Sequence, residues 1–301
     1  MKPKSKIPYY ILAHLSAGMA SLIAGTSFVL TSLIMKTMEP AEATLIRYFF
    51  AFLCVSPFFF ISVGKVRKIP LNDLTAIVIL GFLFYFTFPM TFNWGLQWTS
   101  ASQGALIVST LPILSLLLGS FLKVEKLNRY KSIGCLIAIV GVGVGVSNSS
   151  SDLNPPEKLF SGNLIMFLAV CQAAIFSVFA RKYFQIYGAW LVSIIAITVG
   201  FAIPAPFIIS SYGFESIVNF DGHELIYLFI LGTLGVPIQF GLFSWSIIRL
   251  GPSRATLYLV LTPIPASMLA VFTLNENLSL TFALGLILVT LAIFVANRRD
   301  E

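Results

Sequence analysis

The segments PILSLLLGSFLKVEKLNRYKSIG at residues 112–134 and PIPASMLAVFTLNENLSLTFALG at residues 263–285 match each other at an offset of 151 residues. They share a Pro-Ile start, a Phe, the pattern Glu-x-Leu and a final Gly, without a gap. Extended back to residues 79 and 230, the match holds 15 identities in 56 pairs, where chance in so apolar a composition gives roughly 4 or 5. This repeat predicts two similar halves, residues 1–150 and 151–301.

The composition predicts an integral membrane protein. Hydrophobic residues make up 57% of the 301 residues, charged residues make up 10%, and the mean hydropathy is +0.92. No soluble core needs so much apolar surface. The net charge of +7 could indicate a nucleic-acid partner, but the basic residues form short clusters between apolar runs, which is typical of membrane topology. The three cysteines lie in apolar segments and are interpreted as packing residues, so we expect no metal or cofactor.

Ten apolar windows, most of about 18 to 25 residues, predict ten transmembrane helices and an all-α fold. The windows cover residues 9–35, 42–63, 74–97, 101–122, 132–147, 161–180, 189–211, 224–248, 254–274 and 279–297. Each half contains five of them. Because five is an odd number, the two halves are predicted to cross the membrane in opposite directions.

The positions of the basic residues predict the orientation. Of the 19 Lys and Arg residues, 16 fall in alternating segments at the N-terminus, 64–68, 123–131, 181–182, 249–254 and the C-terminus. The positive-inside rule therefore predicts a multi-pass protein of the cytoplasmic membrane with both termini in the cytoplasm. Inverted repeats of this kind are typical of secondary transporters, whose halves expose a central site to either side in turn.

The motifs, in this order, resemble the EamA-type permeases of the drug/metabolite transporter superfamily over essentially the whole chain. The residues that carry the resemblance are Gly25 to Phe28, Pro40, Arg47, Ser100 to Ser102, Pro112, Glu125 to Leu127, Gly134, and in the second half Gly251 to Ser253, Pro263, Asn275 to Leu278 and Gly285. Ala24 stands where the family commonly has Trp, and Val124 where it has Gly. The resemblance therefore gives no support to an aromatic wall at the centre.

Neutral polar side chains in the middle of the predicted helices are the candidate substrate contacts. They are Ser21, Thr26, Tyr85, Gln172, Ser177, Gln239 and Tyr258. The two amides stand out because an amide that faces lipid is costly; hydrogen bonding between helices is an equally weighted alternative. Such groups in an apolar cavity suit a neutral or zwitterionic solute, such as an amino acid, or a drug.

Charged residues near the membrane have two interpretations each. Arg47 lies well inside a predicted helix, either as an anion contact or gate, or as a structural or snorkelling cation. Glu125 and Glu276 are predicted to begin the last helix of each half, with a gating role as the alternative. No Asp or Glu lies in the middle of a predicted helix, which favours transport without proton coupling.

The function that these features predict is a carrier that exports a small metabolite by alternating access. Prolines within the predicted helices would kink them and shape the central cavity: Pro89, Pro112, Pro237 and Pro263. An uptake permease of the same superfamily and a membrane scaffold without transport are the alternatives. With two histidines and no clustered acids, metal-ligand spacing or nucleophile motif, no enzyme and no catalytic residue is predicted. We expect a monomer or a homodimer in the lipid bilayer.

Overall fold

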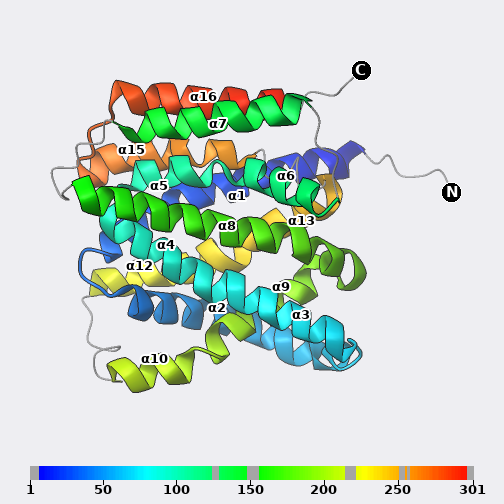
Figure 1. Cartoon of the computed structure of the whole chain (residues 1–301). Coiled ribbons are helices and arrows are strands. Elements are labelled where there is room, and N and C mark those ends of the chain that lie inside the picture. The colour runs from blue at the N-terminus through cyan, green and yellow to red at the C-terminus, as the bar shows by residue number, and fades with distance from the viewer. Residues whose placement is uncertain are drawn as a thin grey trace.

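A computed structural model describes residues 7–123, 129–147, 156–213, 222–250, 255 and 258–296 (Figure 1). Every regular element of the described residues is a helix. The α-helices are α1 (Ile7–Ile34), α2 (Pro40–Val66), α3 (Leu71–Phe82), α4 (Phe88–Trp98), α5 (Ala101–Val108), α6 (Leu111–Phe121), α7 (Arg129–Ser147), α8 (Pro156–Tyr187), α9 (Ala189–Ala202), α10 (Ala205–Tyr212), α12 (Gly222–Thr233), α13 (Gln239–Leu250), α15 (Pro263–Leu274) and α16 (Leu280–Ala296). Two π-helical turns, η1 (Leu83–Thr87) and η2 (Leu234–Ile238), and one 3₁₀ turn, η3 (Tyr258–Leu261), complete the set.

The prediction of an all-helical membrane protein is confirmed. Within the described residues, seven helical stretches are long and apolar enough to cross a bilayer: Ile11–Ile34, Pro40–Val66, Leu71–Trp98, Ala101–Phe121, Glu157–Tyr187, Ala189–Tyr212 and Gly222–Leu250. Three further apolar helices are shorter, at Ser132–Ser147, Tyr258–Leu274 and Leu280–Val295. The predicted number of ten transmembrane helices stays a prediction.

Helices of the two halves correspond at the offset found in the sequence. The bounds of α12 and η2 are those of α3 and η1 shifted by 151 residues, so both halves contain a π-helical turn at the same position. The α3–η1–α4 stretch runs away from the end of the bundle at which α1 begins, whereas α12–η2–α13 runs toward it (Figure 1). Corresponding helices are therefore antiparallel.

Helix breaks coincide with proline, which lacks the N–H that a continuous helix needs. Pro89 is the second residue of α4, directly after η1, and Pro237 lies inside η2. Pro112 is the second residue of α6, after the turn that ends α5. Pro263 is the first residue of α15, after η3. Each of the four prolines thus stands at or beside an interruption of the regular hydrogen-bond ladder.

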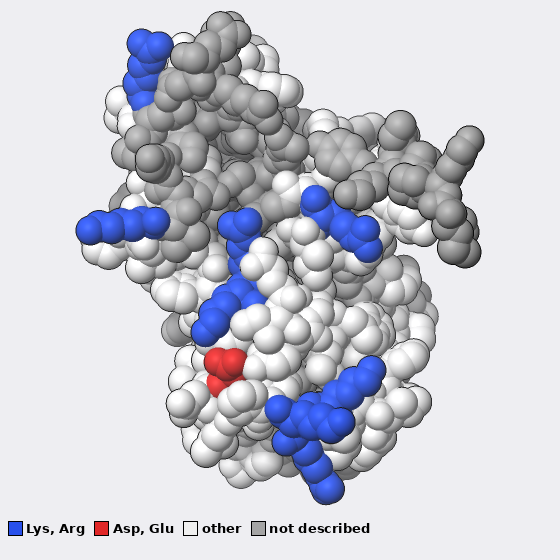
Figure 2. Space-filling model, turned by 90° about the vertical axis from the view of Figure 1, so that its right-hand side faces the viewer, with Lys and Arg blue, Asp and Glu red and all other residues white. Residues whose placement is uncertain are grey.

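Basic side chains gather at the end of the bundle where α1 begins and α16 ends (Figure 2). This end carries the α2–α3 connection with its three basic residues, and the ends of α8 and α13. Asp73, in the first turn of α3, lies 3.9 Å from the Nζ of Lys182 and accepts a hydrogen bond from the Tyr187 hydroxyl at 2.6 Å. These contacts tie α3 of the first half to the end of α8.

The last helices of the two halves, α7 and α16, pack side by side along one edge of the bundle (Figure 1). Glycine makes their close approach possible. A Cβ atom built at Gly285 would lie 2.5 Å from the Cα of Gly145 and 2.6 Å from the carbonyl oxygen of Gly141. In lipid, where apolar burial does not drive helices together, close packing of this kind is one of the forces that hold helices together, with interhelical hydrogen bonds and lipid entropy.

We expect Gly285→Ala to destabilise the protein by about 1–3 kcal/mol, because the added methyl group must push α16 away from α7. The matched control is Gly143→Ala, also in α7, where a Cβ would meet no atom within 4 Å. The midpoint of thermal unfolding in detergent checks this. Equal midpoints for both variants would contradict the proposed packing role.

Candidate functional site

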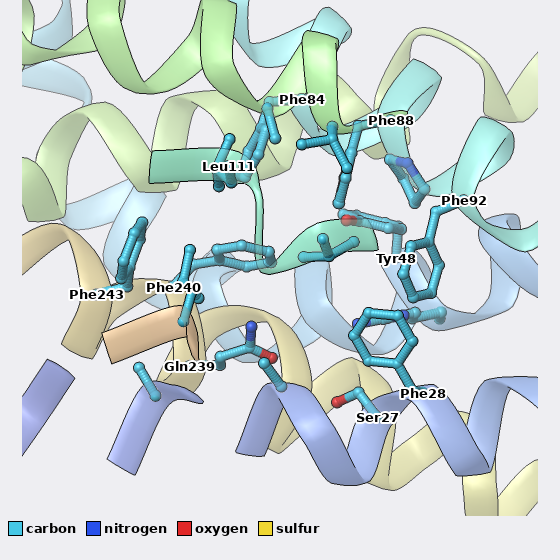
Figure 3. A pocket seen from close by; sticks show the side chains of 18 residues that line it. Ser27, Phe28, Tyr48, Phe84, Phe88, Phe92, Leu111, Gln239, Phe240 and Phe243 are labelled. Carbon is cyan, nitrogen blue, oxygen red and sulfur yellow. The ribbon is translucent and has the colours of Figure 1, made fainter. Parts of the chain in front are cut away.

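A cavity of about 80 Å³ lies in the centre of the bundle, between helices of the two halves (Figure 3). Its wall comes from α1, α2, α4 and α8, from α13, and from the breaks at η1, at η3 and between α5 and α6. The lining residues are Ala20, Ala24, Ser27, Phe28, Arg47, Tyr48, Phe84, Phe88, Pro89, Phe92, Val108, Leu111, Val170, Ala173, Gln239, Phe240, Phe243 and Leu259.

Corresponding positions of the two halves form opposite parts of the wall. Phe92 and Phe243 both line the cavity and stand 151 residues apart. Phe88 and Gln239 are a second such pair, but here a ring in the first half is replaced by an amide in the second. The two halves therefore place residues on the cavity at corresponding positions. Where the residue types differ, one side of the cavity is apolar and the other is polar.

Aromatic rings make up much of the wall. The ring of Phe84 stacks on Phe176 with centroids 4.0 Å apart, and Phe240 meets it edge to face at 5.0 Å. Phe28 and Phe92 meet edge to face at 4.8 Å. Ring pairs of this geometry are favourable beyond the area that they bury, so they hold the wall in a defined shape.

The motifs in the sequence offered no support for an aromatic wall, because alanine stands where the family commonly has tryptophan. That residue, Ala24, does line the cavity and has no ring. The rings come instead from other helices. A signal was present in the spacing of Phe84, Phe88 and Phe92, which recur every four residues and therefore share one side of a helix. With 28 phenylalanines in the chain, that spacing alone does not distinguish a cavity from a lipid-facing surface.

Two polar side chains on the wall have atoms without a hydrogen-bond partner in the described part of the chain. Arg47, in α2, is 7% exposed; its Nη2 donates to the carbonyl of Gly235 at 3.3 Å, and its Nε has no acceptor there. Gln239 points into the cavity from the start of α13 (Figure 3), and its Oε1 has no donor among the described residues. Ser27, by contrast, donates to the carbonyl of Ile23 at 2.9 Å.

The remaining hydroxyl candidates within helices bond to their own backbone and are not among the lining residues. Ser21 donates to Ala17 at 2.9 Å and Thr26 to Ile23 at 2.8 Å. Ser177 donates to the carbonyl three residues before it and lies 3.0 Å from another serine hydroxyl. The hydroxyl of a helical serine or threonine commonly donates its hydrogen bond to a backbone carbonyl one turn earlier. A substrate contact by these residues stays a prediction.

Gln172, Tyr85 and Tyr258 also lie outside the lining set. The Nε2 of Gln172 donates to Thr91 at 3.1 Å, which joins α8 to α4. Tyr85 is fully buried behind the cavity wall, with its ring edge to face against Phe176 and Phe240. The Tyr258 hydroxyl lies 2.6 Å from the Nδ1 of His14 and joins η3 to α1. All three therefore connect helices in this conformation.

Glu276 joins the two halves at the end of the bundle opposite the basic face. Its carboxylate accepts hydrogen bonds from the backbone N–H groups of Ala101 at 2.8 Å and Ser102 at 3.3 Å, and from the Ser102 hydroxyl. These are the first N–H groups of α5, where the helix dipole favours a negative charge. Because α16 begins at Leu280, Glu276 caps a helix of the other half and not its own. Glu125, its counterpart, lies outside the described residues.

Within the described residues, no three His, Cys, Asp or Glu side chains lie close enough together to hold a metal ion. The structure instead presents a membrane-embedded bundle of two similar halves around a small, mostly apolar cavity. This is the architecture of a membrane transporter.

Comparison with known proteins identifies the family. The sequence profile of the EamA-like transporter family matches residues 11–146 and again residues 160–298, so the chain belongs to this family. The resemblance inferred from the motifs is therefore confirmed.

Relatives and solved structures agree with this assignment. The chain is 23% identical to the uncharacterized transporter YetK of Bacillus subtilis over 94% of its own length and 86% of that protein. It is 28% identical to the uncharacterized transporter YdfC of the same organism over 75% and 72% of the two chains. A protein of known crystal structure has the same fold, with a TM-score of 0.66 and 18% identity over 93% of this chain and 95% of that one.

We expect Glu276→Gln to destabilise the contact between the halves by about 1.5–3 kcal/mol, because bonds to an ionised acceptor are stronger than those to an amide. The control is Glu39→Gln, which removes the same charge from an exposed residue. Thermal unfolding in detergent at neutral pH compares the two. A Glu276 variant as stable as the control would show that the carboxylate has no such role.

Proposed function

We propose that this protein exports a small metabolite across the cytoplasmic membrane by alternating access. The observation that supports this most is the central cavity, to which both halves contribute lining residues. A site between two similar halves can be exposed to either side when the halves rock against each other. An uptake permease would use the same cavity in the opposite direction, and a scaffold without transport would not require it.

The proposal includes ten transmembrane helices in two inverted domains, residues 1–150 and 151–301. Support comes from the antiparallel course of α3–η1–α4 and α12–η2–α13 and from their shared offset of 151 residues. The three shorter apolar helices would complete the number that the sequence predicts. The family profile matches residues 11–146 and 160–298, and the proposed boundary lies in the interval between these two matches.

In the proposed orientation the basic end of the bundle faces the cytoplasm, together with both termini. Glu276 then lies at the external end, where it holds α5 of the first half to the second half. At the same end, the Thr99 hydroxyl donates to the side chain of Asn163 at 2.5 Å and joins α4 to α8. We propose that these contacts close the external side and must break when the carrier opens outward.

The small cavity limits the solute. At about 80 Å³ it is smaller than the sites of drug-sized ligands, which occupy roughly 300–1,000 Å³. Its wall combines apolar rings with few polar groups. We therefore propose a small neutral or zwitterionic metabolite, such as a short amino acid, as the substrate, and a larger solute would require the halves to separate.

Replacing Gln239 with leucine should slow transport by about tenfold, the effect of losing one hydrogen bond of about 1.4 kcal/mol to the solute. The test uses vesicles that contain the purified protein and a mixture of amino acids and hydroxy acids, with the solutes that leave measured by mass spectrometry. Gln185→Leu, which changes an exposed amide of α8, is the control. If no solute leaves faster than from protein-free vesicles, the proposed function is wrong.

Transport should be the same with and without a pH gradient across the vesicle membrane. The physical reason is that none of the described lining residues is Asp, Glu or His, so none can take up a proton beside the solute in the usual range. The same efflux measurement with internal and external pH set equal, and then one unit apart, provides the comparison. A several-fold dependence on the gradient would argue for proton coupling.

A further inference from the structure

Arg47 is a buried cation in the cavity wall, and no opposite charge lies among the described lining residues. They include no carboxylate, and the guanidinium makes one hydrogen bond within the described part of the chain, a long one to the Gly235 carbonyl. A charge buried in this way is costly unless something neutralises it. Snorkelling does not explain its place, because the side chain reaches the central cavity and not the membrane surface.

The guanidinium has capacity left for a ligand. Its Nε has no acceptor in the described part of the chain, while Nη2 is directed to Gly235. Arginine donors in a planar fork suit a carboxylate. The Arg47 side chain is the only charged group among the described lining residues, so it matches a single negative charge better than a phosphate dianion.

Gln239 provides the second point of contact. Its Oε1 is a buried acceptor without a donor among the described residues, and it lies four residues after Gly235, to which Arg47 bonds. The Gln239 Oε1 needs a hydrogen-bond donor and the Arg47 Nε needs an acceptor. A solute that satisfies both atoms carries a donor and an anionic acceptor close together. A 2-amino or a 2-hydroxy group next to a carboxylate has that arrangement.

We propose that Arg47 and Gln239 form a two-point site for small 2-hydroxy or 2-amino monocarboxylates, with the carboxylate on Arg47 and the hydroxyl or ammonium group on Gln239. The proposal rests on the transport function proposed above, adds the recognition chemistry, and extends the solutes from zwitterions to monoanions, whose charge the Arg47 guanidinium would neutralise. The apolar body of the solute lies against the rings of the wall, of which Phe84 and Phe88 face Gln239 across the cavity (Figure 3). Because the cavity is small, at about 80 Å³, we choose solutes with a three-carbon chain as probes.

The first test uses the unmodified protein and four probes of nearly equal size: lactate, alanine, lactamide and propionate. Lactamide lacks the charge, propionate lacks the second polar group, and lactate and alanine separate the hydroxyl from the ammonium. We expect at least one of lactate and alanine to bind about tenfold or more tightly than lactamide and propionate, by isothermal calorimetry in detergent. Equal affinity for lactamide would overturn the assignment of the carboxylate.

The second test changes the protein. Arg47→Gln should weaken binding of the preferred acid by about tenfold or more, and Arg47→Lys, which keeps the charge without the fork, should weaken it less. Lys36→Gln removes a positive charge from an exposed residue and is the control. If Arg47→Gln does not fold, Arg47→Lys and the probe series still decide. Unchanged binding by a folded Arg47→Gln variant would overturn the proposal.

The two proposals fail in different ways. If the acid binds but does not leave loaded vesicles faster than from protein-free vesicles, the transport function is wrong and the two-point site stands. If other solutes leave the vesicles while all four probes bind equally or not at all, the carrier stands and the two-point site is wrong.

Discussion

In the hydrocarbon of a bilayer, backbone N–H and C=O groups must find partners inside the protein, and this constraint organises the structure. Irregular backbone is tolerated only where protein or a cavity surrounds it. The breaks at η1, η3 and between α5 and α6 place Phe84, Leu259 and Leu111 on the cavity, and η2 leads directly to Gln239. The prolines that interrupt the helices therefore mark the interior of the bundle. The helical hydrogen-bond ladder can be interrupted at the cavity because the freed backbone groups do not face lipid there.

The two halves contribute the same frame and different side chains. Both have a π-helical turn at the corresponding position, and both place a phenylalanine on the cavity at the positions of Phe92 and Phe243. The polar groups break this symmetry, since Gln239 corresponds to Phe88, and Arg47 is the only charged residue among the described lining residues. A symmetric frame suits the exchange between two openings, while an asymmetric lining allows one solute to bind in one orientation. In the carrier proposed above, duplication accounts for the motion between two openings, and the differences between the halves account for recognition of the solute.

Much of the fold was predictable because membrane insertion depends on averages along the chain. Hydropathy and the repeat identified the helices, and the family followed from motifs that keep their order over both halves. The site was less predictable. Ser21 and Thr26 are polar and central, but a hydroxyl in a helix can bond to a carbonyl one turn earlier, and no pattern in the sequence separates that case from a substrate contact. Gln239 has a longer side chain with more bonding groups, and it is the candidate amide on the cavity wall.

By itself, the sequence determined the membrane class and the family, and it predicted the number of helices and the two halves, because these depend on local composition and on spacing. Only the tertiary structure decided which polar atoms remain without a partner. Glu276 caps α5 of the other half, and Arg47 lies beside Gly235, at separations of 174 or 175 and of 188 residues. Contacts between such distant segments arise from how helices cross. The packing of the two halves therefore decides which of the polar residues named from the sequence face the cavity.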